Sequence, residues 1–241
     1  MYKDNDMKDR WIVVTGASRG VGREVVRCLV ADHGCPVLAV SRASAPLEEL
    51  KAELKDAPGI LEPLVCDIST DAGVGRVVEQ VAMRRLAGLL NNAGVLVKRD
   101  MGAWASEDAA LAFHVNATVP LLLSQALADR LAGDPPGHVV NIGSMGGFHG
   151  SAKFPGLAAY SASKAALACL TECLAEEWKD KQVRVNCLAI GAVDTDMLRE
   201  AFPGYRAPVD AAAMGAYVAR FLLEGHGLYN GKVLPVSVST P

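Results

Sequence analysis

The sequence has few aromatic residues and no marked excess of charge of either sign. Phe, Trp and Tyr make up 5% of the 241 residues, and the formal net charge is -3 at pH 7. A nucleic-acid-binding protein usually presents a basic surface, so we expect no nucleic-acid partner. The charged N-terminal stretch MYKDNDMKDR passes directly into WIVV, without the apolar segment of a secretory signal or a run long enough for a bilayer. We therefore expect a cytoplasmic protein with no membrane partner.

Metal-ligand spacings are also missing. The six cysteines include no CxxC pair, and each lies in an apolar run, at positions 28, 35, 66, 169, 173 and 187. Buried free thiols are their expected state. His114, His138 and His149 form no cluster with neighbouring acidic residues, so no metal site is predicted.

Short uninterrupted apolar runs are abundant, and helix-like segments separate them. Apolar runs without alternation are typical of parallel strands covered on both faces. Strands are predicted at 11–14, 36–40, 61–66, 86–90, 138–142, 183–190 and 232–236, and helices at 20–32, 46–56, 71–84, 106–132, 158–180 and 209–224. The sequence contains no obvious linker or repeat. It predicts an α/β fold in which residues 1–241 form a single Rossmann-type domain, a doubly wound parallel sheet of about seven strands with helices on both faces.

A glycine-rich turn, TGASRGVG at residues 15–22, directly follows the first predicted strand. Gly16 permits a tight turn at the strand end, and Gly20 and Gly22 let backbone NH groups and a helix N-terminus approach a pyrophosphate. The spacing differs from the G-x-G-x-x-G of many dinucleotide folds. The position between the first strand and the first helix nevertheless predicts a dinucleotide site.

The end of the second predicted strand, VLAVSRAS, carries no acid that could bind a ribose 2′-hydroxyl. Ser41 and Arg42 stand there instead, and we expect Arg19 to project from the glycine turn toward the same place. Two arginines can hold a phosphate dianion through charge-assisted hydrogen bonds. The predicted cofactor is therefore NADP(H). The alternative is that Arg42 is a solvated surface charge.

Seven motifs occur in one order along the chain: TGASRGVG at 15–22, CDI at 66–68, NNAG at 91–94, Asn116, Ser144, YSASK at 160–164 and GAVDT at 191–195. With these motifs the chain resembles the short-chain dehydrogenases/reductases over essentially its whole length. The resemblance implies adenine contacts from 67–68, ribose contacts from 91–94 and carboxamide contacts from 191–195. The residues expected to bind the cofactor are Gly16, Ser18, Arg19, Gly20, Val21, Ser41, Arg42, Asp67, Ile68, Asn91, Ala93, Gly94, Tyr160, Lys164, Gly191, Val193 and Thr195.

The resemblance also implies a catalytic set of Asn116, Ser144, Tyr160 and Lys164. Tyr160 and Lys164 are one helical turn apart, so the phenol and the ammonium can reach the same point. A free phenol titrates near pH 10, and a nearby cation favours phenolate. Tyr160 is then the acid that protonates a carbonyl oxygen, or the base in reverse. Without the other motifs, the pair would be a buried tyrosine beside a surface lysine.

Local sequence features also bear on the roles of Ser144 and Asn116. Ser144 follows the strand HVVNIG, where its hydroxyl could stabilise a developing alkoxide or simply cap a helix. Pro120 stands four residues after Asn116 and donates no NH, so the helix should kink at the Asn116 carbonyl. The family resemblance implies that a water there relays protons to the lysine. The alternative is a helix bent only to wrap the core.

Three features depart from the family pattern. Ile190 replaces a strand-end proline, so the turn that follows is expected to be less rigid. The serine-to-tyrosine separation of 16 positions is long, the extra residues being FHGSAKFPG, and only 12 residues, Asp196 to Ala207, precede the Pro208 expected to begin the next helix. Trp104 and Phe148 are candidates to line the substrate pocket. The short lid resembles compact carbonyl reductases and sepiapterin-type pteridine reductases more than oxoacyl-carrier reductases.

The function expected from the residues and the resemblance is reversible NADP(H)-dependent reduction of a ketone or aldehyde. A non-catalytic NADP(H)-binding regulatory protein is the alternative from another class, for which loss of the tyrosine would be the mark. Epimerases and dehydratases that share Tyr-x-x-x-Lys use a second substrate domain, for which the chain is too short. The small apolar residues of the helices at 106–132 and 158–180, whose family counterparts pack against a second subunit, suggest a homodimer or homotetramer.

Overall fold

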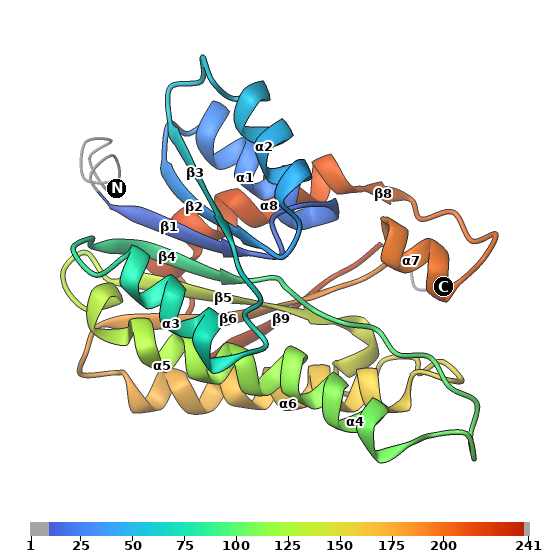
Figure 1. The fold of residues 1–241 in the computed structure, drawn as a ribbon. Helices are drawn as coiled ribbons and strands as arrows, with labels where there is room; N and C mark the ends of the chain where they lie inside the picture. The colour runs from blue at the N-terminus through green and yellow to red at the C-terminus, as the bar shows by residue number, and fades with distance from the viewer. Residues whose placement is uncertain (1–9, 239–241) are drawn as a thin grey trace.

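The computed structural model describes residues 10–238, so the charged N-terminal segment before Arg10 lies outside the described residues. Seven parallel strands form one sheet in the order β3-β2-β1-β4-β5-β6-β9, as Figure 1 shows. This confirms the predicted doubly wound sheet. The strands are β1 Trp11–Thr15, β2 Pro36–Ser41, β3 Ile60–Val65, β4 Leu86–Asn91, β5 Gly137–Ser144, β6 Val183–Ile190 and β9 Lys232–Val236.

Helices cover both faces of the sheet. On one face lie α1 Gly20–Ala31, α2 Ser44–Glu53 and α8 Ala211–Glu224; on the other lie α3 Asp71–Gln80, α4 Ser106–Phe113, α5 Val119–Leu131 and α6 Ala158–Glu177 (Figure 1). Ile12 and Val14 belong to the hydrophobic core under α1 and α8, and Val13 between them belongs to the core under α3 and α5. Both faces of each strand are buried, which is why the strands are continuously apolar.

The helix predicted over 106–132 is interrupted as expected. Between α4 and α5 the chain forms a π-helical turn, His114–Thr118, because Pro120 has no NH to bond the Asn116 carbonyl. The whole stretch Ser106–Leu131 is apolar and long enough, by length and composition, to cross a membrane. Its residues Leu123, Leu127 and Leu131 are fully buried in the core beneath the sheet. It is therefore a core helix of this fold.

Three predictions about local structure were wrong. The segment after Thr195 contains a short helix, α7 Asp196–Ala201, that the sequence did not predict. Pro208 does not begin the next helix, because β8 Val209–Asp210 pairs with β7 Val193–Asp194 and α8 starts at Ala211. Cys169 and Cys173 are exposed, whereas the other four cysteines are buried. Both lie on the side of α6 that faces away from the sheet.

Candidate active site

A cleft of about 860 Å³ opens at the carboxyl edge of the sheet. This is the edge at which open parallel sheets bind their ligands, and the volume is that of a small-molecule site. Every residue expected to bind the cofactor lines the cleft except Asn91. Of the expected catalytic residues, Ser144, Tyr160 and Lys164 line it and Asn116 does not.

The glycine turn packs directly against the end of β4. Gly16 has a φ of +68°, and a Cβ there would lie 2.9 Å from the Cα of Ala93. Thr15 Oγ1 accepts hydrogen bonds from the backbone NH groups of Asn92 and Ala93, and Asn92 Nδ2 donates to the Thr15 carbonyl at 3.0 Å. Asn92 therefore holds the turn in place. The sequence singled out its neighbour Asn91 instead, and only the register of β4 distinguishes the two.

The two arginines expected to bind a 2′-phosphate have different surroundings. Arg42 follows β2 and lies near Asp67, whose pKa is lowered mainly by two hydrogen bonds from Ser69 and to a smaller degree by Arg42. Arg19 instead forms a 3.9 Å ion pair with Asp196, at the start of α7. Arg19 therefore spans the cleft between the glycine turn and α7, although both arginines line it.

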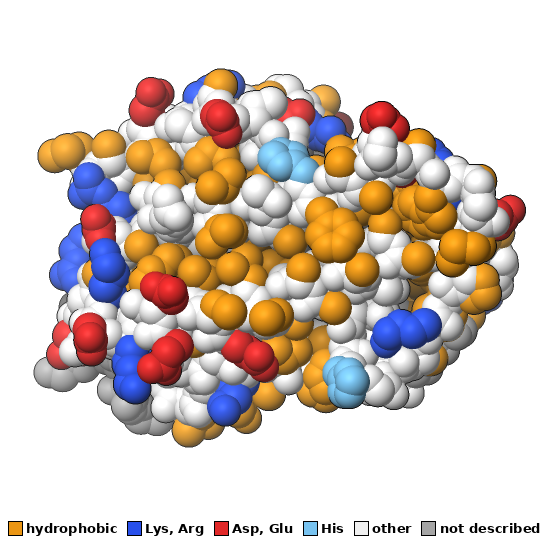
Figure 2. Space-filling view, turned by 90° about the horizontal axis from the view of Figure 1, so that it is seen from below, with side chains coloured by type: hydrophobic (Ala, Val, Ile, Leu, Met, Phe, Trp, Pro, Cys, Tyr) orange, Lys and Arg blue, Asp and Glu red, His pale blue; other side chains and the backbone are white. Residues whose placement is uncertain are grey.

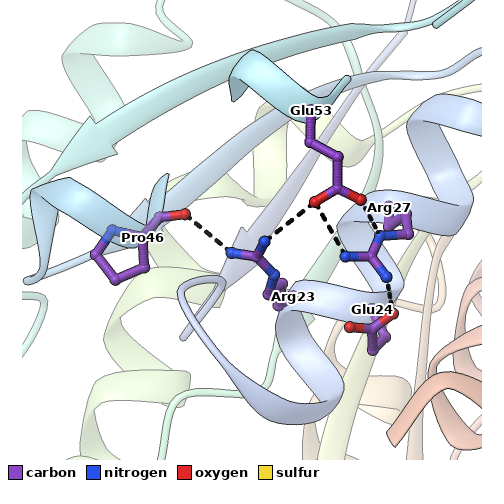
Figure 3. A network of polar contacts seen from close by, with 5 residues as sticks. All are labelled: Arg23, Glu24, Arg27, Pro46 and Glu53. Carbon is purple, nitrogen blue, oxygen red and sulfur yellow. Dashed lines mark hydrogen bonds and ion pairs between the residues drawn. The ribbon is translucent and has the colours of Figure 1, made fainter. Parts of the chain in front are cut away.

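A network of ion pairs joins the helix that carries the glycine turn to the helix that follows Arg42. Glu53 at the end of α2 accepts from Arg23 and Arg27 of α1, and Arg23 also donates to the Pro46 carbonyl at 3.1 Å (Figure 3). Glu24 pairs with Arg27 at 2.9 Å. Such partly exposed pairs each contribute little to stability. Together they fix α2 against α1, and hence the Arg42 loop relative to the glycine turn.

Ser144, Tyr160 and Lys164 meet where β5 ends and α6 begins. Ser144 Oγ accepts from the Gly146 NH at 3.1 Å, which caps the short turn Met145–Gly147, and a hydrogen bond joins its side chain to that of Tyr160. Ser144 therefore caps this turn and also lies beside Tyr160. Lys164 Nζ donates to the Ile142 carbonyl at 2.7 Å.

Burial controls the titration of both helix residues. It raises the pKa of Tyr160 above its ordinary value, and the hydrogen bond with Ser144 partly offsets this. It lowers the pKa of Lys164 to about 8. The sequence predicts that Lys164 lowers the pKa of Tyr160, whereas the protein group that has this effect is Ser144. The reason is that the Lys164 ammonium is directed to the Ile142 carbonyl.

The two asparagines outside the cleft support its walls. Asn116 is fully buried, with Oδ1 accepting from the Val95 NH at 2.9 Å and Nδ2 donating to the Val95 carbonyl and to Ser163 Oγ. Ser163 Oγ in turn donates to the Tyr160 carbonyl at 2.8 Å. The Asn116 side chain therefore joins the loop after β4 to the start of α6. Asn91 points into the core.

The Asn91 amide belongs to a buried polar chain below the cleft. Its Nδ2 donates to Ser124 Oγ at 3.0 Å and to Asn141 Oδ1 at 2.8 Å, and Asn141 Nδ2 donates to Thr171 Oγ1 at 2.9 Å. These bonds tie β4 and β5 to the helices α5 and α6. Buried amides of this kind need every partner satisfied, so the chain favours one arrangement of helices and strands.

The turn after β6 is held by the sheet rather than by a proline. Ile190 pairs with Ser144 of β5 and with Val236 of β9, and the Gly191 NH donates to the Val236 carbonyl at 2.9 Å. A proline at 190 would offer no NH to this ladder. The loss of rigidity expected from Ile190 is therefore offset by strand pairing.

The remaining wall of the cleft is apolar, but Trp104 and Phe148 do not line it. Phe154, from the long loop before α6, and Phe202, directly after α7, occupy the wall instead. The sequence placed the loop near the site but could not show which of its aromatic residues faces inward. Residues 10–238 contain no group of three or more His, Cys, Asp or Glu that could hold a metal ion.

Known proteins resemble this chain in sequence and in fold. A family model described as short chain dehydrogenase matches residues 10–206. The chain is 33% identical to L-xylulose reductase of Caenorhabditis elegans over 208 residues, which cover 83% of this chain and 78% of that protein. It is 32% identical to 3-oxoacyl-[acyl-carrier-protein] reductase of Bos taurus over 194 residues, or 80% of this chain and 79% of that one.

A solved structure of a short chain dehydrogenase from Burkholderia cenocepacia in complex with NADP has a TM-score of 0.86 at 25% identity, with 96% of this chain and 97% of that chain covered. The matched family model spans the glycine turn, Ser144, Tyr160 and Lys164, which the fold brings to one cleft. The chain therefore belongs to the short-chain dehydrogenase/reductase family of oxidoreductases.

Proposed function

We propose that this protein is an NADP(H)-dependent carbonyl reductase, acting as an alcohol dehydrogenase in reverse. The observation that carries the proposal is the convergence of Ser144, Tyr160 and Lys164 on one cleft with the glycine turn. The residues fit a dinucleotide, because the glycine turn, the polar groups after β2 and β3, and the turn after β6 line one continuous cleft at the carboxyl edge of the sheet. Asp67 and Arg42 would hold the adenosine end, and 191–195 the nicotinamide end. The cofactor, when bound, supplies the hydride.

The chain's own residues manage the proton and the oxygen. Tyr160 passes its hydroxyl proton to the carbonyl oxygen while the carbonyl carbon receives the hydride, which leaves a phenolate and an alcohol. Ser144 Oγ accepts from Gly146, and its hydroxyl is hydrogen-bonded to Tyr160; with a carbonyl oxygen placed beside both side chains, the Ser144 hydroxyl would donate to the developing oxyanion. The Lys164 ammonium, one helical turn away, would favour the phenolate once that charge forms, and a water on the Asn116 carbonyl would return the proton from solvent. Alcohol oxidation uses the same groups in the opposite order.

NADP(H) is favoured over NAD(H) by the absence of an acid at the end of β2. Ser41 and Arg42 line the cleft there, and Arg19 lines it from the glycine turn with an exposed side chain. A phosphate dianion would draw both guanidinium groups, because such charge-assisted bonds are stronger than the exposed Arg19–Asp196 pair. The NADP complex of the related short chain dehydrogenase is consistent with this choice.

The protein is further proposed to assemble as a homodimer or homotetramer through the outer face of α5 and α6. Figure 2 shows apolar side chains spread over this face, with charged ones near its margins. The face includes Ala126 on α5 and Ala162, Ala165, Cys169 and Cys173 on α6, all exposed. Contiguous exposed apolar surface of this kind marks interaction sites. We also propose that residues 1–241 form a single domain and that the protein acts on a small molecule in the cytoplasm.

Other functions remain as alternatives for the test. A 3-oxoacyl thioester reductase would agree with the Bos taurus relative, and a pteridine reductase with the short lid. A regulatory protein without catalysis would bind the cofactor but turn nothing over. The intact Tyr160 and Lys164 favour an enzyme.

The testing experiment is a fluorescence titration with NADPH and NADH, followed by cofactor oxidation with diketones, quinones, aldehydes, pterins and oxoacyl thioesters. We expect tighter NADPH binding, and turnover that is lost in Tyr160→Phe while NADPH affinity is kept. Binding without turnover on any carbonyl would support the regulatory alternative. Unchanged turnover in Tyr160→Phe would contradict the assigned proton donor.

A further inference from the structure

The wall of the cleft beyond Ser144 and Tyr160 is built almost wholly from apolar side chains. It includes Leu96, Leu111, Phe154, Leu157, Met197 and Phe202. Among the described residues that line the cleft, the charged ones other than Lys164 are Arg19, Arg42, Asp67 and Asp196. The first three belong to the glycine turn and the adenosine side. Asp196 is paired with Arg199 at 2.7 Å and with Arg19.

Two aromatic rings close this wall from separate segments of the chain. Phe154 comes from the loop between β5 and α6, and Phe202 follows α7. Their ring centroids are 5.2 Å apart with an interplanar angle of 78°, an edge-to-face contact. Such pairs are favourable beyond their buried area and leave ring faces available to a further aromatic or aliphatic group. Both side chains are half-buried, so the pair lies between the cleft and the solvent.

The loop after β4 holds the ring pair in position. Lys98 Nζ donates to the Ala201 carbonyl at 2.8 Å and lies 5.5 Å from the centroid of the Phe202 ring. The Arg99 NH donates to the Gly156 carbonyl at 3.1 Å, which fixes the loop that carries Phe154. Gly156 has a φ of +81°, and a Cβ there would lie 3.0 Å from Lys98 Cγ. Lys98 itself does not line the cleft. Its charge therefore adds no polar partner for a ligand.

We propose that this wall selects uncharged carbonyl compounds with an aryl or bulky alkyl substituent, and that Phe154 and Phe202 are the specificity-determining residues. The inference rests on the proposed function and narrows its substrate class. An apolar substituent that packs against this wall is removed from water without losing a hydrogen bond, and this burial of apolar surface is favourable. A ketose or an oxoacid would bury hydroxyl or carboxylate groups beside side chains that offer no hydrogen bond.

The experiment measures binding without requiring turnover. Acetophenone, xylulose and pyruvate are titrated by calorimetry into the protein, both alone and saturated with its preferred oxidised cofactor. The variants are Phe154→Ala, Phe202→Ala and Phe202→Leu, and the matched control is Phe148→Ala, an aromatic residue of the same loop that does not line the cleft. Thermal melts verify that each variant is folded, and cofactor affinity verifies that the rest of the site is intact.

We expect acetophenone to bind at least about 10-fold more tightly than xylulose or pyruvate. Each alanine variant should weaken acetophenone binding by about 10-fold. Phe202→Leu should keep most of the affinity, because it keeps the wall apolar, and Phe148→Ala should keep all of it. Preferential binding of xylulose or pyruvate would overturn the inference. So would alanine variants that bind acetophenone as tightly as Phe148→Ala does.

The two proposals can fail separately. If no carbonyl is turned over but acetophenone binds selectively and depends on the two rings, the reductase proposal fails and the selectivity proposal stands. If xylulose or pyruvate is reduced efficiently and the ring variants change neither binding nor kcat/KM, the reductase stands and the selectivity proposal fails.

Discussion

Lys164 Nζ donates a 2.7 Å hydrogen bond to the carbonyl oxygen of Ile142, two residues before Ser144 on the same strand. Through this bond the helix that carries Tyr160 is attached to the strand that carries Ser144. A Cβ at Gly94 would lie 3.5 Å from the same Nζ, so the loop after β4 also approaches the lysine closely. The protein therefore positions the ammonium with its own backbone, at the cost of burying it.

This burial leads to a prediction for Lys164→Met. The buried ammonium has a pKa of about 8, against an ordinary value of 10.5, so between these two pH values the unfolded chain binds a proton that the folded chain has released. Wild-type stability should therefore gain from this residue as pH rises through the window. At pH 7 the variant, although inactive, should gain up to about 3 kcal/mol from removal of the buried charge, offset in part by loss of the hydrogen bond to the Ile142 carbonyl.

Urea unfolding of both proteins at pH 7 and pH 10 measures the effect. The difference in stability between variant and wild type should shrink at pH 10. Other groups that titrate there are common to both proteins, so their contributions cancel in this difference. A difference that is the same at both pH values would show that the buried charge does not oppose folding.

Ser144→Ala should slow the reaction and move its pH dependence. The Ser144 hydrogen bond lowers the pKa of Tyr160, so its loss should raise that pKa. Alcohol oxidation needs the phenolate, so the rising limb of its rate profile should move to higher pH. Loss of an oxyanion donor should also reduce kcat by about 100-fold or more. Profiles of kcat against pH measure both effects, and an unmoved limb would argue against the hydrogen bond.

Arg42→Ala should weaken NADPH binding by about 10-fold or more and leave NADH binding nearly unchanged. The reason is that a charge-assisted contact to a 2′-phosphate is lost, while NADH has no such phosphate. Fluorescence titrations with both cofactors measure the ratio. Arg76→Ala is the control, because Arg76 donates to the Val65 carbonyl and does not line the cleft. Equal losses for both cofactors would mean that Arg42 acts on structure and not on the phosphate.

Two glycines of α3 should respond oppositely to alanine. A Cβ at Gly75 meets nothing within 4 Å, whereas one at Gly73 would lie 1.9 Å from the Asp67 carbonyl oxygen. Gly75→Ala should therefore stabilise the protein by about 0.5–1 kcal/mol, because alanine favours the helix. Gly73→Ala should destabilise it and weaken cofactor binding through displacement of Asp67. Thermal melts and NADPH titrations measure the pair, and similar behaviour of the two variants would contradict the packing described for α3.

Ala126→Glu should prevent or weaken the proposed assembly. A carboxylate on the apolar face of α5 and α6 would be buried without a partner at an interface. Light scattering after gel filtration should show a homodimer or homotetramer for the wild type and a smaller species for the variant. Met83→Glu is the control, because Met83 is 96% exposed and lies outside both helices. A wild-type monomer at micromolar concentration would overturn the assembly proposal.

The sequence predicted the sheet well because burial on both faces leaves a simple mark, an unbroken apolar run such as VRVNCLAI in β6. Pro120 likewise predicted the interruption of the long helix, since a missing NH is a local property. The inward turn of Phe154 rather than Phe148, and the use of Asn92 rather than Asn91, depend on contacts between distant segments. The pairing of β7 with β8 is likewise non-local, and two-residue strands leave no periodicity to detect.

The packing of α8 on α1 has a consequence for biosynthesis. A Cβ at Gly215 of α8 would lie 2.5 Å from Cβ of Glu24 on α1, so the two helices are in close contact although one is near the start of the chain and the other near its end. Chains emerge from the ribosome at about 5–20 residues per second. The apolar side of α1 that meets α8 must therefore wait roughly ten seconds or more for its cover. The glycine turn and α1 are therefore synthesised early, whereas α8, which packs against α1, is one of the last elements to be synthesised.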